Sequence, residues 1–229
     1  AKSKDYNHTS SWYIERTASF FETKKIQYAI RSTITDFSVD RISEIVQYFV
    51  INAPSAKTIH LEPLAIAGRA NDSSLKTPSN AKMIAQLELV HKNFNGAKQK
   101  VYVSGCDISR ISNKFCGAYG RNFFINPQGF VTTCLEVCRQ SDQFSNIFFI
   151  GHYHTADNAF VFDNDRIDFL SKLTVNSKPR CSNCIAKYNC AGGCLIKDYR
   201  EANIKATNGL RRCNLTQEIV EKQIFSFLQ

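Results

Sequence analysis

CSNCIAKYNCAGGC, residues 181–194, is the stretch on which the prediction for the second half of this chain depends. It contains Cys181-x2-Cys184-x5-Cys190-x3-Cys194, with two glycines inside the last interval. The first two cysteines form a CxxC pair, in which two thiolates from one tight turn reach the same metal. The last two are too far apart in sequence to share that turn. They therefore either complete one metal site or serve two.

Cysteines continue on both sides of this stretch, but none falls in the first 105 residues. The chain has nine cysteines, and the other five are Cys106, Cys116, Cys134, Cys138 and Cys213. An odd count and an N-terminus without an apolar signal-peptide core argue against a secreted disulfide framework. We therefore interpret the thiols as metal ligands in a reducing, cytoplasmic compartment.

Seven of these thiols follow a regular order, Cys116-x12-Gly129-x4-Cys134, then the four in residues 181–194, then Cys213. Seven exceed the four ligands of one tetrahedral zinc ion. They approach the eight that two [4Fe–4S] clusters use. Zinc and iron–sulfur clusters take the same thiolate ligand, so spacing alone leaves both kinds of site open.

The overall composition is that of an ordinary globular protein, with 229 residues, 43% hydrophobic and 21% charged. No apolar run approaches the roughly 18 residues of a membrane-spanning helix, so we expect no membrane partner. The net charge of +9 is scattered singly and in pairs rather than in basic blocks. We therefore expect no nucleic-acid partner either.

Residues 1–105 alternate helical and extended patterns, which predicts an α/β fold with a parallel sheet. Helical periodicity is found around 10–23, 42–49 and 81–93, and strand-like runs at 25–35, 58–63 and 100–104. A complete eight-stranded barrel needs about 250 residues, so this half holds only about three strand–helix units. It is either a small open sheet or part of a barrel whose first strands are missing.

Residues 106–229 do not continue the alternation of helical and extended patterns. Two extended runs flank Asn126-Pro127-Gln128-Gly129, which predicts a hairpin over 123–133. Short and long helices are expected at 167–172 and 215–227, the latter with Ile219, Ile224 and Phe227 as core contacts. We interpret His152 and His154 as partly exposed loop residues rather than as metal ligands.

The full cysteine pattern with its internal Gly129 resembles the SPASM extension of radical S-adenosylmethionine enzymes, and it covers about half of the chain. The resemblance implies that residues 1–105 are the C-terminal portion of a partial (β/α) barrel. It implies that residues 106–229 are a SPASM domain with a hairpin, short helices and two auxiliary [4Fe–4S] clusters. One cluster is then ligated by Cys181, Cys184, Cys190 and Cys213. The other takes Cys116, Cys134, Cys194 and an upstream residue, for which Cys106 is the best candidate and Cys138 the second.

One departure from the family concerns the CxxxCxxC motif that holds its cofactor-cleaving cluster. After Cys134-x3-Cys138 the third position is Ser141, and after Cys190-x3-Cys194 it is Lys197. We therefore expect the first strands and that cluster to lie outside this chain. The implied parent is an oxidoreductase that binds S-adenosylmethionine and modifies a peptide or protein side chain through a 5′-deoxyadenosyl radical. This chain alone is expected to be inactive.

Weaker resemblances in the first half concern Ile30-Arg31-Ser32-Thr33 and His60-Leu61-Glu62-Pro63, which are similar to barrel strands of the family. They imply that Arg31 and Glu62 contact the cofactor or substrate. The alternative is that each pairs with a neighbouring charge in a purely structural role.

Two other functions stay open. The sulfatase-maturing branch of the family carries an Asp base directly after its second motif cysteine, where this chain has Leu135. Glu136 is one residue further on, where a strand pleat would turn it to the opposite side, which favours the branch that modifies ribosomal peptides. A non-catalytic zinc-binding or electron-transfer module is the other alternative.

The expected partners follow from this interpretation. They are a peptide or protein substrate and an electron donor such as flavodoxin or ferredoxin. We also expect self-association through the open barrel edge, unless the helix at 10–23 folds over that edge. Aerobic preparations are expected to contain zinc or empty, partly oxidised sites, because thiolates that lose iron bind zinc.

Overall fold

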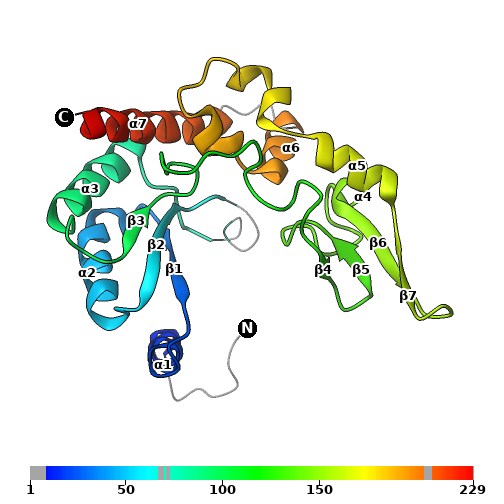
Figure 1. Cartoon of the computed structure of the whole chain (residues 1–229), viewed down its shortest axis with the longest axis horizontal. Coiled ribbons are helices and arrows are strands. Elements are labelled where there is room, and N and C mark those ends of the chain that lie inside the picture. The colour runs from blue at the N-terminus through cyan, green and yellow to red at the C-terminus, as the bar shows by residue number, and fades with distance from the viewer. Residues whose placement is uncertain (1–8, 67–69, 71–72, 204–207, 229) are drawn as a thin grey trace. The chain divides into compact units, whose positions relative to one another are not determined.

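The computed structural model describes residues 9–66, 70, 73–203 and 208–228, with the backbone alone for 200–203 and 208–211. The chain forms two compact units, residues 1–104 and residues 105–229. One contains a three-stranded parallel sheet and the other a four-stranded antiparallel sheet (Figure 1). The fold is therefore mixed α/β, and no closed barrel is present among the described residues. None of the described helices combines the length and apolarity needed to cross a membrane.

The first unit is built on a parallel sheet in the order β1-β2-β3. In its register Arg31 lies beside His60, and His60 beside Tyr102. The predicted alternation of helices and strands is confirmed, although the third strand is shorter than expected. The elements are α1 (Ser10–Thr23), β1 (Tyr28–Ile34), η1 (Val39–Arg41), α2 (Ile42–Asn52), β2 (Ala56–Pro63), α3 (Asn80–Asn93) and β3 (Lys100–Tyr102).

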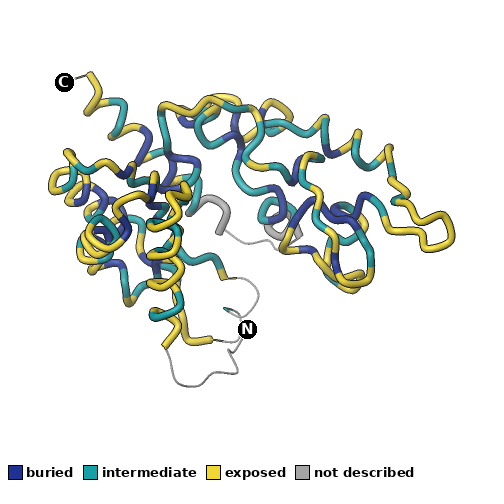
Figure 2. The backbone as a smooth tube through the Cα atoms, turned by 60° about the horizontal axis from the view of Figure 1, so that its bottom comes forward, coloured by how far each residue is buried: buried dark blue, intermediate teal, exposed yellow. Residues whose placement is uncertain are grey.

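Burial explains why these segments fold together. Successive strand side chains point to opposite faces, and in β2 Ile59 and Leu61 are fully buried while His60 and Glu62, which alternate with them, are not. The predicted helical stripes supply the matching apolar surface, with Val46 of α2 and Met83 of α3 fully buried. Buried positions lie along the strands and the inner sides of the helices (Figure 2). His60 and Glu62 are thereby left on the other face of the sheet.

Helix α1 differs from the others because it contains no buried residue. It is attached mainly by polar contacts. The Glu22 carboxylate accepts hydrogen bonds from the Tyr28 hydroxyl at 2.6 Å and from the Ser55 amide at 2.9 Å. The Tyr48 hydroxyl donates to Glu15 at 2.7 Å. These bonds connect α1 with β1, with α2 and with the loop that follows α2.

The second unit contains an antiparallel sheet in the order β4-β5-β6-β7. The predicted hairpin is confirmed, and Asn126 organises its turn. The Asn126 side-chain oxygen accepts from the amides of Gln128 at 3.0 Å and Phe130 at 2.8 Å. Gly129 adopts a left-handed φ of 83°, which favours glycine. The strands are β4 (Phe124–Ile125), β5 (Phe130–Thr132), β6 (Phe149–His154) and β7 (Ala159–Phe162).

Three expectations for this unit are wrong or incomplete. His152 and His154 lie on the exposed strand β6 rather than in a loop. The C-terminal helix is longer than predicted, and Phe227 is 82% exposed instead of being a core contact. The remaining elements are α4 (Ser145–Phe148), α5 (Asn164–Lys172), η3 (Val175–Ser177), η4 (Pro179–Cys181), the π-helical turn η5 (Lys187–Ala191), α6 (Leu195–Asn203) and α7 (Asn208–Leu228).

Candidate metal centre

All nine cysteines are free thiols, and they all belong to the second unit. Short irregular elements carry most of the seven in the motif. Cys181 ends the 3-10 turn η4, which Pro179 opens, and Cys190 lies in the π-helical turn η5. Cys194 directly precedes α6, and Cys213 lies on α7. The thiols are therefore presented by tight turns and helix ends rather than by the sheet.

Three of these thiols form a first group, Cys116, Cys134 and Cys194. The Cys134 sulfur interacts electrostatically with Cys194 and with Cys116, and Cys194 interacts with Cys116. Burial raises the pKa of Cys134 to about 11 and also raises the pKa of Cys194. Thiols in such surroundings stay protonated unless a cation compensates the thiolate charge.

The other four thiols form a second group, Cys181, Cys184, Cys190 and Cys213. Cys190 and Cys213 interact with each other, and each interacts with both members of the CxxC pair. Burial raises the pKa of Cys190 to about 11. The Gln217 side-chain amide donates to the Cys184 sulfur at 3.3 Å. The helix that carries Cys213 therefore also supplies a polar neighbour to the CxxC pair.

Charged and amide groups surround both sets of sulfurs. In the first group, the backbone amides of Glu136 and Lys197 hydrogen-bond to the sulfurs of Cys134 and Cys194. In the second group, the Arg180 guanidinium hydrogen-bonds to Cys181, and Arg180 also interacts with Cys213. N–H donors and cations of this kind stabilise thiolate sulfur, as they do around thiolate-ligated metals.

Glu136 lies in a turn that follows strand β5. Strand β5 ends at Thr132, and residues 134–137 form a turn closed by the Val137 amide, which donates to the Cys134 carbonyl at 3.0 Å. Within this turn both Leu135 and Glu136 are exposed, and the Glu136 carboxylate adds charge repulsion to the burial that raises the pKa of the Cys134 and Cys194 thiols. The expectation that Glu136 lies on the opposite side from Leu135 stays a prediction, and the strand pleat on which it was based does not extend to these residues.

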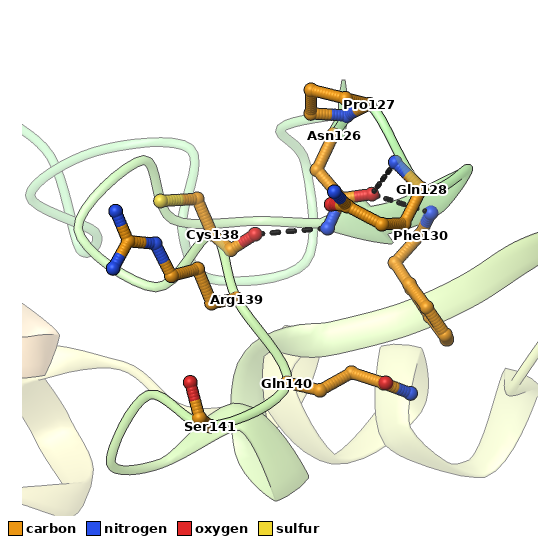
Figure 3. Close-up of a pocket in the computed structure, with 8 residues that line it drawn as sticks. All are labelled: Asn126, Pro127, Gln128, Phe130, Cys138, Arg139, Gln140 and Ser141. Carbon is orange, nitrogen blue, oxygen red and sulfur yellow. Dashed lines mark hydrogen bonds between the residues drawn. The ribbon is translucent and has the colours of Figure 1, made fainter.

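The two candidates for an eighth ligand have different surroundings. Cys106 is fully buried, and the preceding Gly105 packs against Cys190, because a Cβ there would lie 3.7 Å from the Cys190 sulfur. Cys138 is exposed and lines a surface pocket of about 480 Å³. Its carbonyl accepts from the Asn126 side chain at 2.9 Å (Figure 3). Because Cys190 belongs to the second group, these surroundings do not decide between Cys106 and Cys138 as the eighth ligand.

The thiols do not form a preformed site for a single metal ion. Among the described residues, no three His, Cys, Asp or Glu side chains are arranged so that they could hold one metal ion. A tetrahedral zinc ion needs its sulfurs at about 2.3 Å from one point.

The first unit brings Arg31 and Glu62 together. The Arg31 guanidinium lies 3.7 Å from the Glu62 carboxylate, and the side chains are 67% and 12% exposed respectively. The Ser104 amide donates to Glu62 at 3.0 Å. This pairing is the structural alternative that the sequence left open, and it also leaves Arg31 accessible to a ligand.

The sequence did not reveal that Tyr102 lies beside His60 on the face of the parallel sheet that carries His60 and Glu62. The Tyr102 hydroxyl lies 3.0 Å from the His60 Nε2 atom, and Thr58 lies 3.1 Å from the same nitrogen. The buried His60 Nδ1 atom has no hydrogen-bond partner among the described residues. Only the parallel register could have indicated this juxtaposition, because the two strands are far apart in sequence.

The chain matches no protein-family model and no curated protein sequence. Its chemistry therefore follows from the site itself. Its most distinctive feature is the seven free thiols in two groups, with backbone amides beside Cys134 and Cys194 and the Arg180 guanidinium beside Cys181.

Proposed function

We propose that this chain is the iron–sulfur-binding portion of an enzyme similar to radical S-adenosylmethionine/SPASM maturases, which modify a peptide or protein side chain. The observation that carries the proposal is the division of the seven thiols into two groups. The resemblance implies the same division for two auxiliary clusters.

In this proposal the second unit holds the two clusters. Bound [4Fe–4S] clusters supply one-electron transfer or orient a substrate. Cys181, Cys184, Cys190 and Cys213 hold one cluster, and Cys116, Cys134, Cys194 and Cys106 hold the other. Cys106, Cys134 and Cys181 are buried, whereas Cys116 is exposed and leaves the second of these sites open to solvent on one side. The Arg180 guanidinium and the amides beside the sulfurs compensate the thiolate charge.

The parallel sheet of the first unit is the second part of the proposal. We assign it to the C-terminal portion of a partial barrel, whose functional groups lie near the carboxyl ends of the strands. Arg31 and Glu62 are the residues expected to contact S-adenosylmethionine or the substrate. A peptide or protein substrate and a flavodoxin- or ferredoxin-like electron donor complete this scheme, and the expected compartment is the cytoplasm.

Metal analysis after anaerobic reconstitution tests this function. The chain should bind about eight irons with an equal amount of sulfide, because two cubanes contain that number. About one or two zinc ions per chain, bound without sulfide after anaerobic purification, would instead support the zinc-binding module, because each tetrahedral zinc takes four ligands. The chain alone should form no 5′-deoxyadenosine, since Ser141 and Lys197 replace the third thiolate. Product above background after dithionite reduction would contradict this.

One observation favours the sulfatase-maturing branch as a second candidate. The carboxylate of Glu136 lies beside Cys134 and Cys194, although the residue after Cys134 is Leu135 rather than an acid. The two branches differ in their product. Conversion of a sulfatase-derived Cys or Ser peptide to formylglycine by the parent enzyme would establish this second function. Modification of a different residue type would establish the first.

A further inference from the structure

Strand β7 lies at one edge of the antiparallel sheet, and β6 is its single neighbour among the described strands (Figure 1). Its four residues, Ala159–Phe162, include no charged residue and no proline. The ladder with β6 runs from Gly151 opposite Phe162 to His154 opposite Ala159 without a bulge. Proteins usually protect an exposed strand edge with charge, proline or a bulge. This edge has none of the three.

The register determines which backbone groups of β7 face outward. The Asp163 amide donates to the Ile150 carbonyl at 2.8 Å, so Asp163 and Ile150 form a hydrogen-bonded pair. Such pairs alternate along an antiparallel ladder, which directs the backbone groups of Val161 toward β6 as well. The N–H and C=O groups of Phe160 and Phe162 are therefore directed away from β6. They form a short template for another strand.

An aromatic cluster, formed by Phe123, Tyr153, Phe160 and Phe162, covers one face of this edge. The centroid of the Phe123 ring lies 5.7 Å from that of Phe160 and 5.8 Å from that of Phe162. Tyr153 lies opposite Phe160 on β6, with a centroid distance of 5.2 Å. Phe123 and Phe162 are 49% and 39% exposed, so solvent reaches the cluster. Apolar surface beside an open edge can hold the alternate side chains of an added strand.

Gly151 makes room for the aromatic cluster. It lies opposite Phe162, and a Cβ at this position would lie 3.0 Å from the Phe162 ring and 2.5 Å from the Val161 carbonyl oxygen. Any side chain here would displace β7 or the ring. The glycine therefore lets the Phe162 ring lie over β6, beside Phe123.

Aspartates flank β7 at both ends, although the chain as a whole has a net charge of +9. Asp157 precedes the strand, and its side chain is 70% exposed. Asp163 and the exposed Asp165 follow the strand, and Asp163 pairs with Arg166 at 3.1 Å. Residues 151–170 contain four aspartates against one arginine. The open edge therefore lies in acidic surroundings.

These charges distinguish between the possible occupants of the edge. If β7 paired antiparallel with a second copy of itself, the Asp157 end of one copy would meet the Asp163 end of the other. Like charges that face each other destabilise strand pairing, whereas opposite charges stabilise it. The charge pattern therefore favours a strand with basic ends over a second copy of this chain.

We propose that the β7 edge is a docking site for an extended segment of a partner polypeptide, with apolar residues at alternate positions and a Lys or Arg at each end. The segment adds antiparallel to β7 as a fifth strand. Its backbone bonds to Phe160 and Phe162, and its apolar side chains lie on the aromatic cluster. This inference involves no metal and does not rest on the proposed function.

The test measures binding of a fluorescent probe peptide, Lys-Val-Thr-Val-Thr-Val-Lys, to the full chain by anisotropy. Residues that face each other in an antiparallel pair share a face, so the valines lie opposite Phe160 and Phe162 and direct their N–H groups toward β7. N-methylation of the valines should therefore abolish binding. N-methylation of the threonines should leave binding intact, because their N–H groups face solvent.

Variants of the chain test the charge and the aromatic cluster. Asp157→Lys should weaken binding of the probe roughly two- to fivefold at low salt, and it should strengthen binding of the same peptide with glutamate at each end. Glu44→Lys makes the same charge change at an exposed acid of the first unit and should leave the preference between the two peptides unchanged. Phe123→Ser removes one exposed ring of the cluster and should weaken binding of both peptides.

Several results would overturn the inference. These are no saturable binding of the probe, equal binding of the two N-methylated peptides, or an unchanged preference in Asp157→Lys. Self-association of the chain that the probe reverses would show that a second copy occupies the edge, and would overturn it as well. If Phe123→Ser fails to fold, the N-methylated peptides decide, since they require only the wild-type chain. Uptake of iron and sulfide is measured separately, so the proposed function stands or falls independently.

Discussion

At the scale of single residues, the ligand assignment makes a direct prediction. Cys184→Ala should remove about four of about eight irons and one paramagnetic signal, because the second group loses a ligand while the first is untouched. Cys134→Ala should remove the complementary signal. Iron and sulfide analysis with low-temperature spectra measures both. Cys138→Ala is the matched control and should leave both signals, since its thiol lines a separate surface pocket. Loss of both signals, or of neither, in Cys184→Ala would show that the division of ligands is wrong.

The two glycines between Cys190 and Cys194 allow a second residue-scale prediction. Gly192 and Gly193 have left-handed φ values of 78° and 75°, so an alanine at either position costs roughly 1–2 kcal/mol of unfolding free energy. Only Gly192 faces the Lys178 side chain, whereas nothing lies within 4 Å of a Cβ at Gly193. Gly192→Ala should therefore be the more destabilising of the two in urea unfolding of the metal-free chain. Equal losses would mean that Lys178 moves aside without cost.

At the scale of elements, the attachment of α1 should depend on pH. Hydrogen bonds from Ser55 and Tyr28 lower the pKa of Glu22 below its ordinary 4.5. These hydrogen bonds stabilise the attachment of α1 at pH values above the ordinary pKa of the carboxyl group. That stabilisation is lost as the pH falls through the lower pKa that Glu22 has in the folded state. Trp12, the only tryptophan, is half-buried on this helix, so its emission should shift to the red as the pH falls below about 4.5.

Variants separate this attachment from general acid unfolding. Glu22→Gln should show red-shifted Trp12 emission already at pH 7 and a smaller change on acidification. Glu44→Gln is the control, because Glu44 forms only an exposed ion pair with Arg41. Wild-type emission in Glu22→Gln at neutral pH would show that apolar contacts alone hold α1.

At the scale of the whole molecule, we expect the isolated chain to self-associate. Strand β1 is the edge of the described parallel sheet, and its outer backbone groups offer a template for another strand. Helix α1 competes for this position, since it hydrogen-bonds to Tyr28 at the start of β1. Light scattering across a dilution series measures the outcome, and the mass should rise above that of one chain with concentration. A single-chain mass throughout would mean that α1 covers the edge from within.

The sequence by itself determined those features that depend on local periodicity and turn chemistry. The apolar stripes of α2 and α3, the alternating strands and the Asn126–Gly129 turn follow from residues within a few positions of one another. Strands β6 and β7 escaped prediction because neither alternates: β6 begins with the buried pair Phe149 and Ile150 and ends exposed, and β7 is largely exposed.

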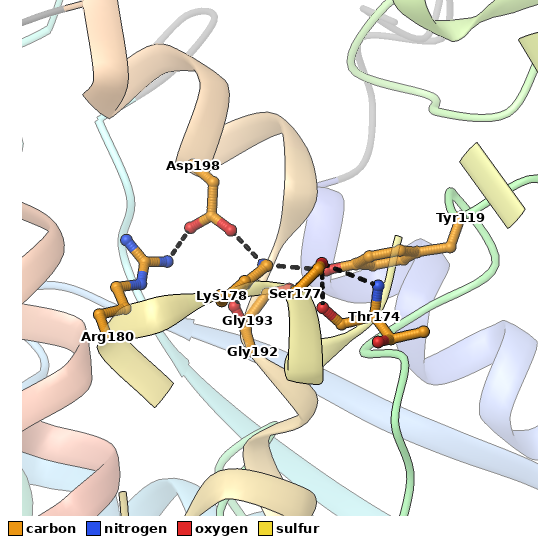
Figure 4. Close-up of polar contacts among 8 residues, drawn as sticks. All are labelled: Tyr119, Thr174, Ser177, Lys178, Arg180, Gly192, Gly193 and Asp198. Atoms are coloured by element: carbon orange, nitrogen blue, oxygen red, sulfur yellow. Dashed lines mark hydrogen bonds and ion pairs between the residues drawn. The ribbon is translucent and has the colours of Figure 1, made fainter. Parts of the chain in front are cut away.

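Only the tertiary structure decided which distant polar groups meet. Lys178 and Asp198 are twenty residues apart and carry no motif, so the sequence does not reveal that one ammonium ion links α6 with the loop between two cysteines (Figure 4). Arg31 and Glu62 meet through the register of two parallel strands. Glu136 lies in a turn rather than on a strand because β5 ends at Thr132. A buried charge is stable only beside its partner, and packing of the whole unit determines which partner is within reach.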